Sequence, residues 1–253
     1  MTIEGNQAVL ALANVSHCFG NARALHEISL TVQAGERVAL LGPSGAGKST
    51  LLNVLNGTIA PTAGQVEVLG RSLHHLSARQ LRQIQRQLGR VHQHHDLVAN
   101  LAVIHNVNAG HLGRWSAPKA ALSLVWPQAV ETAAAALDQV GLVDKLYART
   151  DRLSGGEQQR VAIARLLVQD PRVVLADEPI ASVDPARAHD LMTSLRDWCG
   201  QTGKTWVVSL HDVAFARCYC DRLIGLRQGR VLFDQPVDQV SDAMLQRLYQ
   251  LSP

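Results

Sequence analysis

Alternating and continuous apolar stretches at the start of the chain predict strands. Residues 8–16 (AVLALANVS) and 25–32 (LHEISLTV) carry strand patterns, and Gly20 and Asn21 between them are typical turn residues. Residues 36–42 (ERVALLG) form a short apolar run that ends in glycine, which is typical of a buried parallel strand. The pattern therefore predicts a β-rich hairpin region that leads into a buried sheet.

The spacing of apolar residues becomes helical between residues 77 and 169. Pro118 and Pro127 mark breaks around a short segment within this stretch. We expect an inserted α-helical subdomain here. Its predicted helices span residues 78–88 (ARQLRQIQRQL), 129–140 (AVETAAAALDQV) and 157–168 (EQQRVAIARLLV).

Strand patterns return after residue 170. Residues 172–178 (RVVLADE) and 205–211 (TWVVSLH) are predicted strands, and the helical pattern of residues 185–199 between them makes a βαβ unit. A hairpin with Gln228 and Gly229 near its turn and a final helix complete the pattern. These two elements span residues 221–234 (DRLIGLRQGRVLFD) and 242–249 (DAMLQRLY).

Composition and charge narrow the class of protein. The 253 residues suffice for one large domain, and 47% hydrophobic with 18% charged residues is ordinary for a globular α/β protein. The net charge is only +3 without a basic run, so we expect no nucleic-acid partner; Arg79, Arg82, Arg86 and Arg90 suit a solvated helix face. No stretch approaches the roughly 20 apolar residues of a membrane span, and the N-terminus does not resemble a signal peptide. We therefore expect the chain in the cytosol.

Histidines cluster at residues 92–95 (HQHH). Adjacent side chains of an extended strand face opposite ways, so at most His92 and His94 could share one metal ion. A polar surface loop is the alternative interpretation, and the spacing leaves both open. The four cysteines lack zinc-like spacing, so reduced thiols are expected.

Residues 42–50 (GPSGAGKST), which we call the phosphate loop, match the pattern G-x-x-x-x-G-K-[ST] between a predicted strand and a predicted helix. Its glycines let successive N–H groups converge on phosphates, Lys48 is expected to reach the β- and γ-phosphates, and the Ser49 hydroxyl is expected to bind magnesium. The chain is therefore predicted to bind a nucleoside triphosphate. The predicted nucleotide-binding residues of this loop are Gly42, Pro43, Ser44, Gly45, Ala46, Gly47, Lys48, Ser49 and Thr50.

Asp177 and Glu178 end a predicted strand, at the edge where ligands of open α/β sheets gather. Asp177 is placed to hold magnesium through water, and Glu178 to orient and polarise the attacking water at the γ-phosphate. A lone Asp-Glu pair after a strand would be a solvated turn. Beside a phosphate loop, we predict that the pair is catalytic.

Residues 153–160 (LSGGEQQR), which we call the signature segment, predict a second anion site. The Ser154 hydroxyl and the N–H groups of Gly155 and Gly156 would open the helix that follows. Because Lys48 lies far away along the chain, the two anion sites cannot belong to one local turn. The second site is useful only if a phosphate arrives from outside.

In its order of motifs the sequence resembles the nucleotide-binding subunits of ABC transporters, over nearly the whole chain. Phe19 stands where the family's adenine-stacking Tyr is more usual, and stacking needs only the face of the ring. The alternative for Phe19 is an aromatic packed on the β region. The matched residues are Phe19, the phosphate loop, Gln93, Leu153, Ser154, Gly155, Gly156 and Gln158 of the signature segment, Asp177, Glu178, Asp184 and His211.

The resemblance implies an ATPase whose two identical subunits pair head to tail, so that the signature segment and Asp184 of one act on the ATP held by Lys48 of the other. It implies that His211 contacts the γ-phosphate and that Gln93 senses magnesium or water together with the membrane partner. Implied catalytic residues are Glu178, His211 and Gln93, and implied magnesium ligands are Ser49, Gln93 and Asp177. The implied partners are an integral-membrane permease and, through it, a periplasmic substrate-binding protein. The ATPase would be peripheral, at the cytoplasmic face of the inner membrane.

The expected architecture is one α/β ABC ATPase domain over residues 1–253. Residues 1–76 and 170–253 would form a RecA-like P-loop NTPase core with an N-terminal antiparallel β subdomain. Residues 77–169 would form an inserted, mainly α-helical subdomain that carries the signature segment.

The cargo is inferred from further similarity. Ile180 replaces the Thr of most of the superfamily, and residues 101–115 and 218–234 look like the corresponding stretches of phosphonate importer ATPases. We expect ATP hydrolysis to energise uptake of phosphonate or a related phosphorus oxyanion, with another transported cargo as the alternative. A non-transport ABC ATPase would show coiled-coil arms or two tandem cassettes, and a regulatory module that does not hydrolyse ATP would be expected to lose Glu178 or His211.

Overall fold

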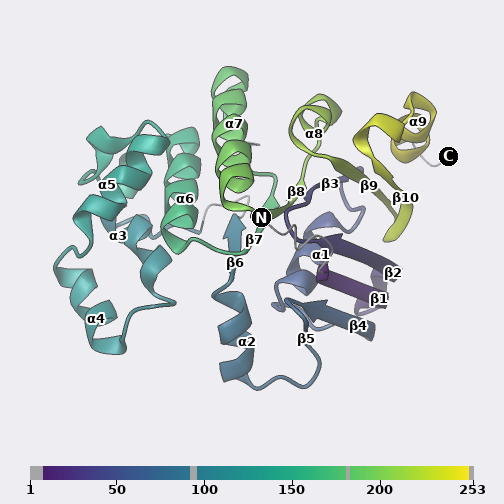
Figure 1. Cartoon of the computed structure of the whole chain (residues 1–253), viewed down its shortest axis with the longest axis horizontal. Helices are drawn as coiled ribbons and strands as arrows, with labels where there is room; N and C mark the ends of the chain where they lie inside the picture. The colour runs from purple at the N-terminus through teal and green to yellow at the C-terminus, as the bar shows by residue number, and fades with distance from the viewer. Residues whose placement is uncertain (1–7, 92–95, 181–182, 251–253) are drawn as a thin grey trace, which may run out of the picture.

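The computed structural model describes residues 8–91, 96–180 and 183–250, and within these ranges the chain forms two sheets surrounded by helices (Figure 1). The larger sheet has the strand order β10-β9-β3-β8-β7-β6, parallel throughout except where β10 returns antiparallel to β9. Parallel strands require covered faces, which explains the continuous apolar runs of the sequence. The strands are β3 Arg37–Leu41, β6 Leu88–Val91, β7 Val173–Asp177, β8 Thr205–Ser209, β9 Arg222–Arg227 and β10 Arg230–Pro236.

The smaller sheet is antiparallel, with the strand order β2-β1-β4-β5, and it confirms the predicted N-terminal β subdomain. β1 and β2 form a hairpin in which Phe19 pairs with Ala22 across the predicted turn at Gly20 and Asn21. Its strands are β1 Ala8–Phe19, β2 Ala22–Gln33, β4 Ala63–Val68 and β5 Arg71–Ser72.

Helix α1, Lys48–Leu55, lies between the two sheets and contacts both β7 and the antiparallel strands. Leu51 and Leu52 are buried in a cluster that also contains Leu10 of β1 and Val173 of β7. Full burial of one such side chain contributes about 1.5–3 kcal/mol. This packing fixes the start of α1, and with it the phosphate loop, against the core sheet.

Helix α6 contacts β6 of the larger sheet, and α3, α4 and α5 lie together on the left of Figure 1, where α3 and α5 pack on α6. A second buried cluster joins α3, α5, α6 and α7 to the sheet, with Trp206 of β8 fully buried in it. The helices on this side and at the C-terminal end are α3 Val103–Asn108, α4 Ala117–Val125, α5 Val130–Gln139, α6 Gly155–Gln169, α7 Pro185–Thr202, α8 Val213–Tyr219 and α9 Asp242–Tyr249.

The helix expected over residues 78–88 is shorter, since α2 spans Ala78–Gln85 and the chain then enters β6, which pairs in parallel with β7. Arg90 therefore lies on a strand, where it donates to the side chains of Asn53 and Thr58, and its placement on a solvated helix face was wrong. Four residues are too few to show a strand period beside a helical pattern. Residues 77–169 thus include one strand of the larger sheet. The boundaries of the predicted helical subdomain, at residues 77 and 169, stay a prediction.

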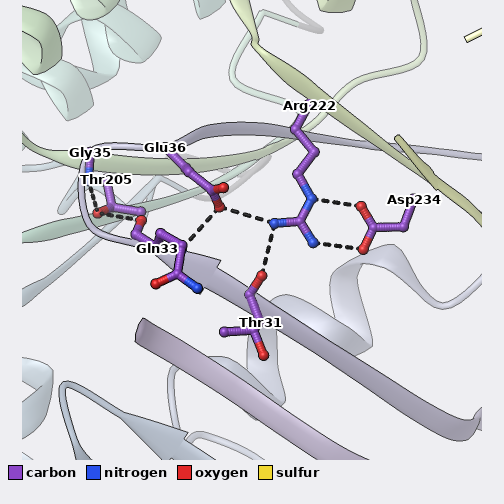
Figure 2. A network of polar contacts seen from close by, with 7 residues as sticks. All are labelled: Thr31, Gln33, Gly35, Glu36, Thr205, Arg222 and Asp234. Atoms are coloured by element: carbon purple, nitrogen blue, oxygen red, sulfur yellow. Dashed lines mark hydrogen bonds and ion pairs between the residues drawn. The ribbon is translucent and has the colours of Figure 1, made fainter. Parts of the chain in front are cut away.

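Arg222 on β9 ties the two sheets together (Figure 2). Its guanidinium forms a bidentate pair with Asp234 of β10, at 2.6 and 2.7 Å, and this pairing raises the pKa of Arg222. Its Nη1 also donates to Oε2 of Glu36 (3.0 Å) and to the carbonyl of Thr31 on β2 (2.8 Å). Because β2 belongs to the antiparallel sheet, one side chain fixes that sheet against the edge of the core.

Candidate functional site

The phosphate loop connects β3 to α1 and depends on two glycines. Gly42 and Gly47 have φ angles of +148° and +104°. A Cβ on Gly42 would lie 2.1 Å from the carbonyl oxygen of Leu226, and one on Gly47 would lie 2.6 Å from that of Ala24. Neither position has room for a side chain, so both glycines of the sequence pattern G-x-x-x-x-G-K-[ST] are required for steric reasons.

Lys48 begins α1 and is 5% exposed. Its ammonium group donates to the carbonyl of Gly42 at 2.7 Å and to that of Pro43 at 3.2 Å, inside the loop. Burial lowers the pKa of Lys48, and the nearby charges of Glu178 and Asp177 oppose that effect. A buried cation in a glycine-lined loop is a suitable partner for phosphate oxygens.

The acid pair lies at the end of β7 and is organised by one hydroxyl. Ser209 of β8 donates its Oγ–H to Asp177 at 2.6 Å, and the same oxygen accepts the Glu178 N–H at 3.0 Å. Asp177 is 9% exposed, so it is not part of a solvated turn. Glu178 has a φ of +51°, an uncommon conformation for a residue with a side chain and one that recurs at functional sites.

His211 follows the next strand of the sheet, β8, and reaches Glu178. Its Nε2 atom lies 2.5 Å from Oε1 of Glu178. The side chain of His211 is 47% exposed whereas that of Glu178 is 16% exposed. The next residue, Asp212, caps α8 by accepting the N–H of Ala214 at 2.6 Å, which fixes the turn that carries His211.

These groups surround one cavity of about 320 Å³. The phosphate loop forms one wall, and Glu178 with His211 forms another. Two residues of the site had no sequence signal: Ala24, which lines the cavity, and Ser209, which resembles any polar residue at the end of a strand. The lining residues are Ala24, Ser44, Gly45, Ala46, Gly47, Lys48, Ser49, Thr50, Glu178 and His211.

The signature segment opens α6 and is not part of that lining. Ser154 and Glu157 form a capping box, in which the Ser154 hydroxyl accepts the Glu157 N–H at 3.3 Å and the Glu157 carboxylate accepts the Ser154 N–H at 2.8 Å. Gln158 donates to the carbonyl of Leu153 at 3.1 Å. Ser154 and Gly155 are exposed, so the helix end is open to a ligand from outside the chain.

The remaining predicted residues lie elsewhere. Phe19 ends β1 with 53% exposure, and its ring makes an edge contact with the ring of His17, with 4.6 Å between centroids. Asp184 caps α7 by accepting the Arg187 N–H at 3.1 Å. Gln93, with His92, His94 and His95, lies outside the described residues.

Oxygen donors at the cavity fit a magnesium ion. Ser49 lines the cavity, and the buried carboxylate of Asp177 lies close enough for its charge to influence the ammonium of Lys48. Hydroxyl and carboxylate oxygens are the ligands that magnesium prefers.

Comparison with known proteins decides the family. The sequence model of the protein family described as ABC transporter matches residues 25–181, which include the phosphate loop, the signature segment and the acid pair. The chain belongs to the ABC transporter family. It is 44% identical to phosphonates import ATP-binding protein PhnC 2 of Cupriavidus metallidurans, over 98% of this chain and 89% of that one.

Two further comparisons extend this result. A phosphonates import ATP-binding protein PhnC of Anaeromyxobacter dehalogenans is 47% identical over 95% of the chain, although the chain spans only 48% of that relative's length. The dimeric, post-hydrolysis structure of the ATP-binding cassette MJ0796, bound to ADP and Pi, matches with a TM-score of 0.78 and 31% identity, over 90% of this chain and 98% of that one. The predictions of a P-loop NTPase fold and of an ABC ATPase resembling phosphonate importer subunits are confirmed.

Proposed function

We propose that this chain is the ATP-hydrolysing subunit of an ABC importer for phosphonate or a related phosphorus oxyanion. One observation carries the proposal: the phosphate loop, Glu178 and His211 line the same cavity. Relatives named for phosphonate import supply the cargo class, because the similarity extends over nearly the whole chain.

The side chains around the cavity have distinct roles in this proposal. Lys48 and the N–H groups of the phosphate loop hold the β- and γ-phosphates. Glu178 polarises the attacking water, and its hydrogen bond to His211 supports a role for the imidazole at the γ-phosphate. Mg²⁺, held by Ser49, Asp177 and Gln93, would neutralise charge on the phosphates.

The position of the signature segment supports a head-to-tail homodimer. Ser154 is exposed and lies outside the cavity that Lys48 lines. A second copy can therefore present its Ser154, Gly155, Gly156 and Gln158 to the γ-phosphate, and its Asp184 beside them. ATP then holds the two copies together, and hydrolysis releases them.

The importer proposal also requires membrane partners. Within the described ranges, no helix combines the length and hydropathy needed for a bilayer crossing. We propose that the chain is peripheral, at the cytoplasmic face of the inner membrane, and that it binds an integral-membrane permease which receives cargo from a periplasmic substrate-binding protein.

A growth experiment tests two parts of the proposal together: that ATP hydrolysis by this chain energises import, and that the cargo is a phosphonate. A Lys48→Ala strain is compared with its parent on a simple alkylphosphonate and on phosphate as the only phosphorus source. We expect growth to fail on the phosphonate alone. Lys145→Ala, which changes an exposed lysine paired with Asp144, is the matched control and should grow on both. Growth of the Lys48→Ala strain on phosphonate, with loss of ATPase activity confirmed in the purified variant, would exclude this cargo.

A further inference from the structure

Strand β8 ends in a fully buried hydroxyl at the carboxyl edge of the larger sheet. The three residues before it, Trp206, Val207 and Val208, are apolar and buried, and Ser209 itself is 0% exposed. A hydroxyl in such a position costs free energy unless its hydrogen bonds are made. An apolar side chain would therefore suit the packing of β8 better, and what Ser209 contacts indicates why a hydroxyl is there.

The acid pair uses the Ser209 hydroxyl both as a donor and as an acceptor. The Glu178 N–H donates to Oγ at 3.0 Å, and Oγ lies 2.6 Å from Oδ1 of Asp177. A serine hydroxyl has a single proton, and this proton is donated to Asp177. The 2.6 Å separation is typical of a hydroxyl bonded to a carboxylate, which is stronger than a bond between two neutral groups. One oxygen atom thus joins the side chain of Asp177 to the backbone of Glu178.

The contact with the N–H group supports an uncommon backbone conformation. Glu178 has a φ of +51°, in the left-handed region, and such a conformation persists only where the surrounding contacts hold it. This backbone sets the direction in which the Glu178 carboxylate leaves the sheet, and that carboxylate reaches Nε2 of His211 at 2.5 Å. Without the Ser209 oxygen, the partly buried N–H of Glu178 would lose its acceptor.

We propose that Ser209 is a positioning residue for ATP hydrolysis, whose single hydroxyl orients the carboxylate of Asp177 and holds the backbone of Glu178. The inference rests on the proposed roles of these two acids, at magnesium and at the attacking water. The described lining of the nucleotide cavity does not include Ser209, so the hydroxyl acts through the acids rather than on the nucleotide. Groups that hydrogen-bond a metal-binding carboxylate tune the affinity for the metal, and catalysis requires the same geometric precision.

Ser209→Ala removes the hydroxyl and changes little else. We expect kcat to fall about 10- to 100-fold, and the affinity for Mn²⁺ to weaken by a similar factor. Mn²⁺ binding is measured by electron paramagnetic resonance with a bound ATP analogue that is not hydrolysed. The Kd for ATP without a divalent metal should equal that of the parent, since Lys48 and the phosphate loop are unchanged. Because one hydroxyl serves both acids, an unchanged kcat or an unchanged Mn²⁺ affinity would overturn the proposal.

Thr205, at the other end of β8, supplies the matched control. It is 1% exposed, and its Oγ1 accepts the N–H of Gly35 at 2.9 Å. Thr205→Val therefore removes a buried, hydrogen-bonded hydroxyl from the same strand, about 13 Å from Ser209. It should lower the Tm, as Ser209→Ala does, but leave kcat and Mn²⁺ affinity at the values of the parent. Equal losses of Mn²⁺ affinity in the two variants would show a general effect of strand stability and would contradict the proposal.

A second substitution at the same position covers the case in which Ser209→Ala does not fold. Ser209→Cys keeps the shape of the side chain but replaces the hydroxyl with a weak donor, so it should show both losses. The parent and Lys48→Ala are assayed alongside. A parent that does not hydrolyse ATP would refute the proposed function, whereas an active parent with normal Ser209 variants would refute only the role of Ser209.

Discussion

Nε2 of His211 lies 2.5 Å from Oε1 of Glu178, although the two residues follow different strands. The register explains the contact: Asp177 of β7 pairs with Ser209 of the parallel neighbour β8, so the residues that follow leave the sheet side by side. The carboxylate and the imidazole therefore meet at the carboxyl edge of the sheet, facing the phosphate loop. In the proposed function, the γ-phosphate and the attacking water lie beside this pair.

Ser154→Arg should block turnover and leave nucleotide binding intact, because in the proposed dimer the phosphate that Ser154 contacts is held by the partner. We expect ATPase activity to fall about 100-fold or more, as when one oxyanion donor is removed. The Kd of the monomer for nucleotide, measured by fluorescence or calorimetry, should not change. Ser116→Arg, at the N-cap residue of α4, is the control. Equal loss of nucleotide affinity in the Ser154→Arg monomer would place the signature segment in its own chain's site.

Arg222→Met should destabilise the fold, because Asp234 and Glu36 would lose their shared partner at a site where all three side chains are at most 30% exposed. We expect a loss of about 2–4 kcal/mol and a fall in Tm of roughly 4–16 °C by calorimetry. Arg37→Met breaks a more exposed pair with Asp221 and should cost about 0–1 kcal/mol. Equal falls in Tm for the two variants would show that Arg222 has no special role at the junction of the sheets.

The sequence predicted the parts of the site that depend on local geometry. The pattern around Gly42 and Lys48 has a steric basis within one loop, and the apolar run before Asp177 is a buried strand whose end is the sheet edge. Both could be read without knowledge of any distant contact. The hairpin turn at Gly20 was equally local.

Features that depend on long-range contacts could not be predicted in the same way. Ser209 organises the acid pair only because β7 and β8 are neighbours in register. The strand β6 contains four residues and is defined by its pairing with β7. The tail was predicted as a helix, but the contact of Tyr249 with His211 follows from where α9 packs, which periodicity does not encode.

Static light scattering of Glu178→Gln with saturating ATP tests most directly whether the site is completed by a second copy. The amide keeps the size of the carboxylate and its capacity to hydrogen-bond His211, but it cannot polarise water, so hydrolysis should fall by about 100-fold or more while ATP stays bound. We predict the mass of two chains with ATP and of one chain without it. Adding Lys48→Ala to this variant should abolish the dimer. Only monomer at saturating ATP would contradict a site shared between two copies.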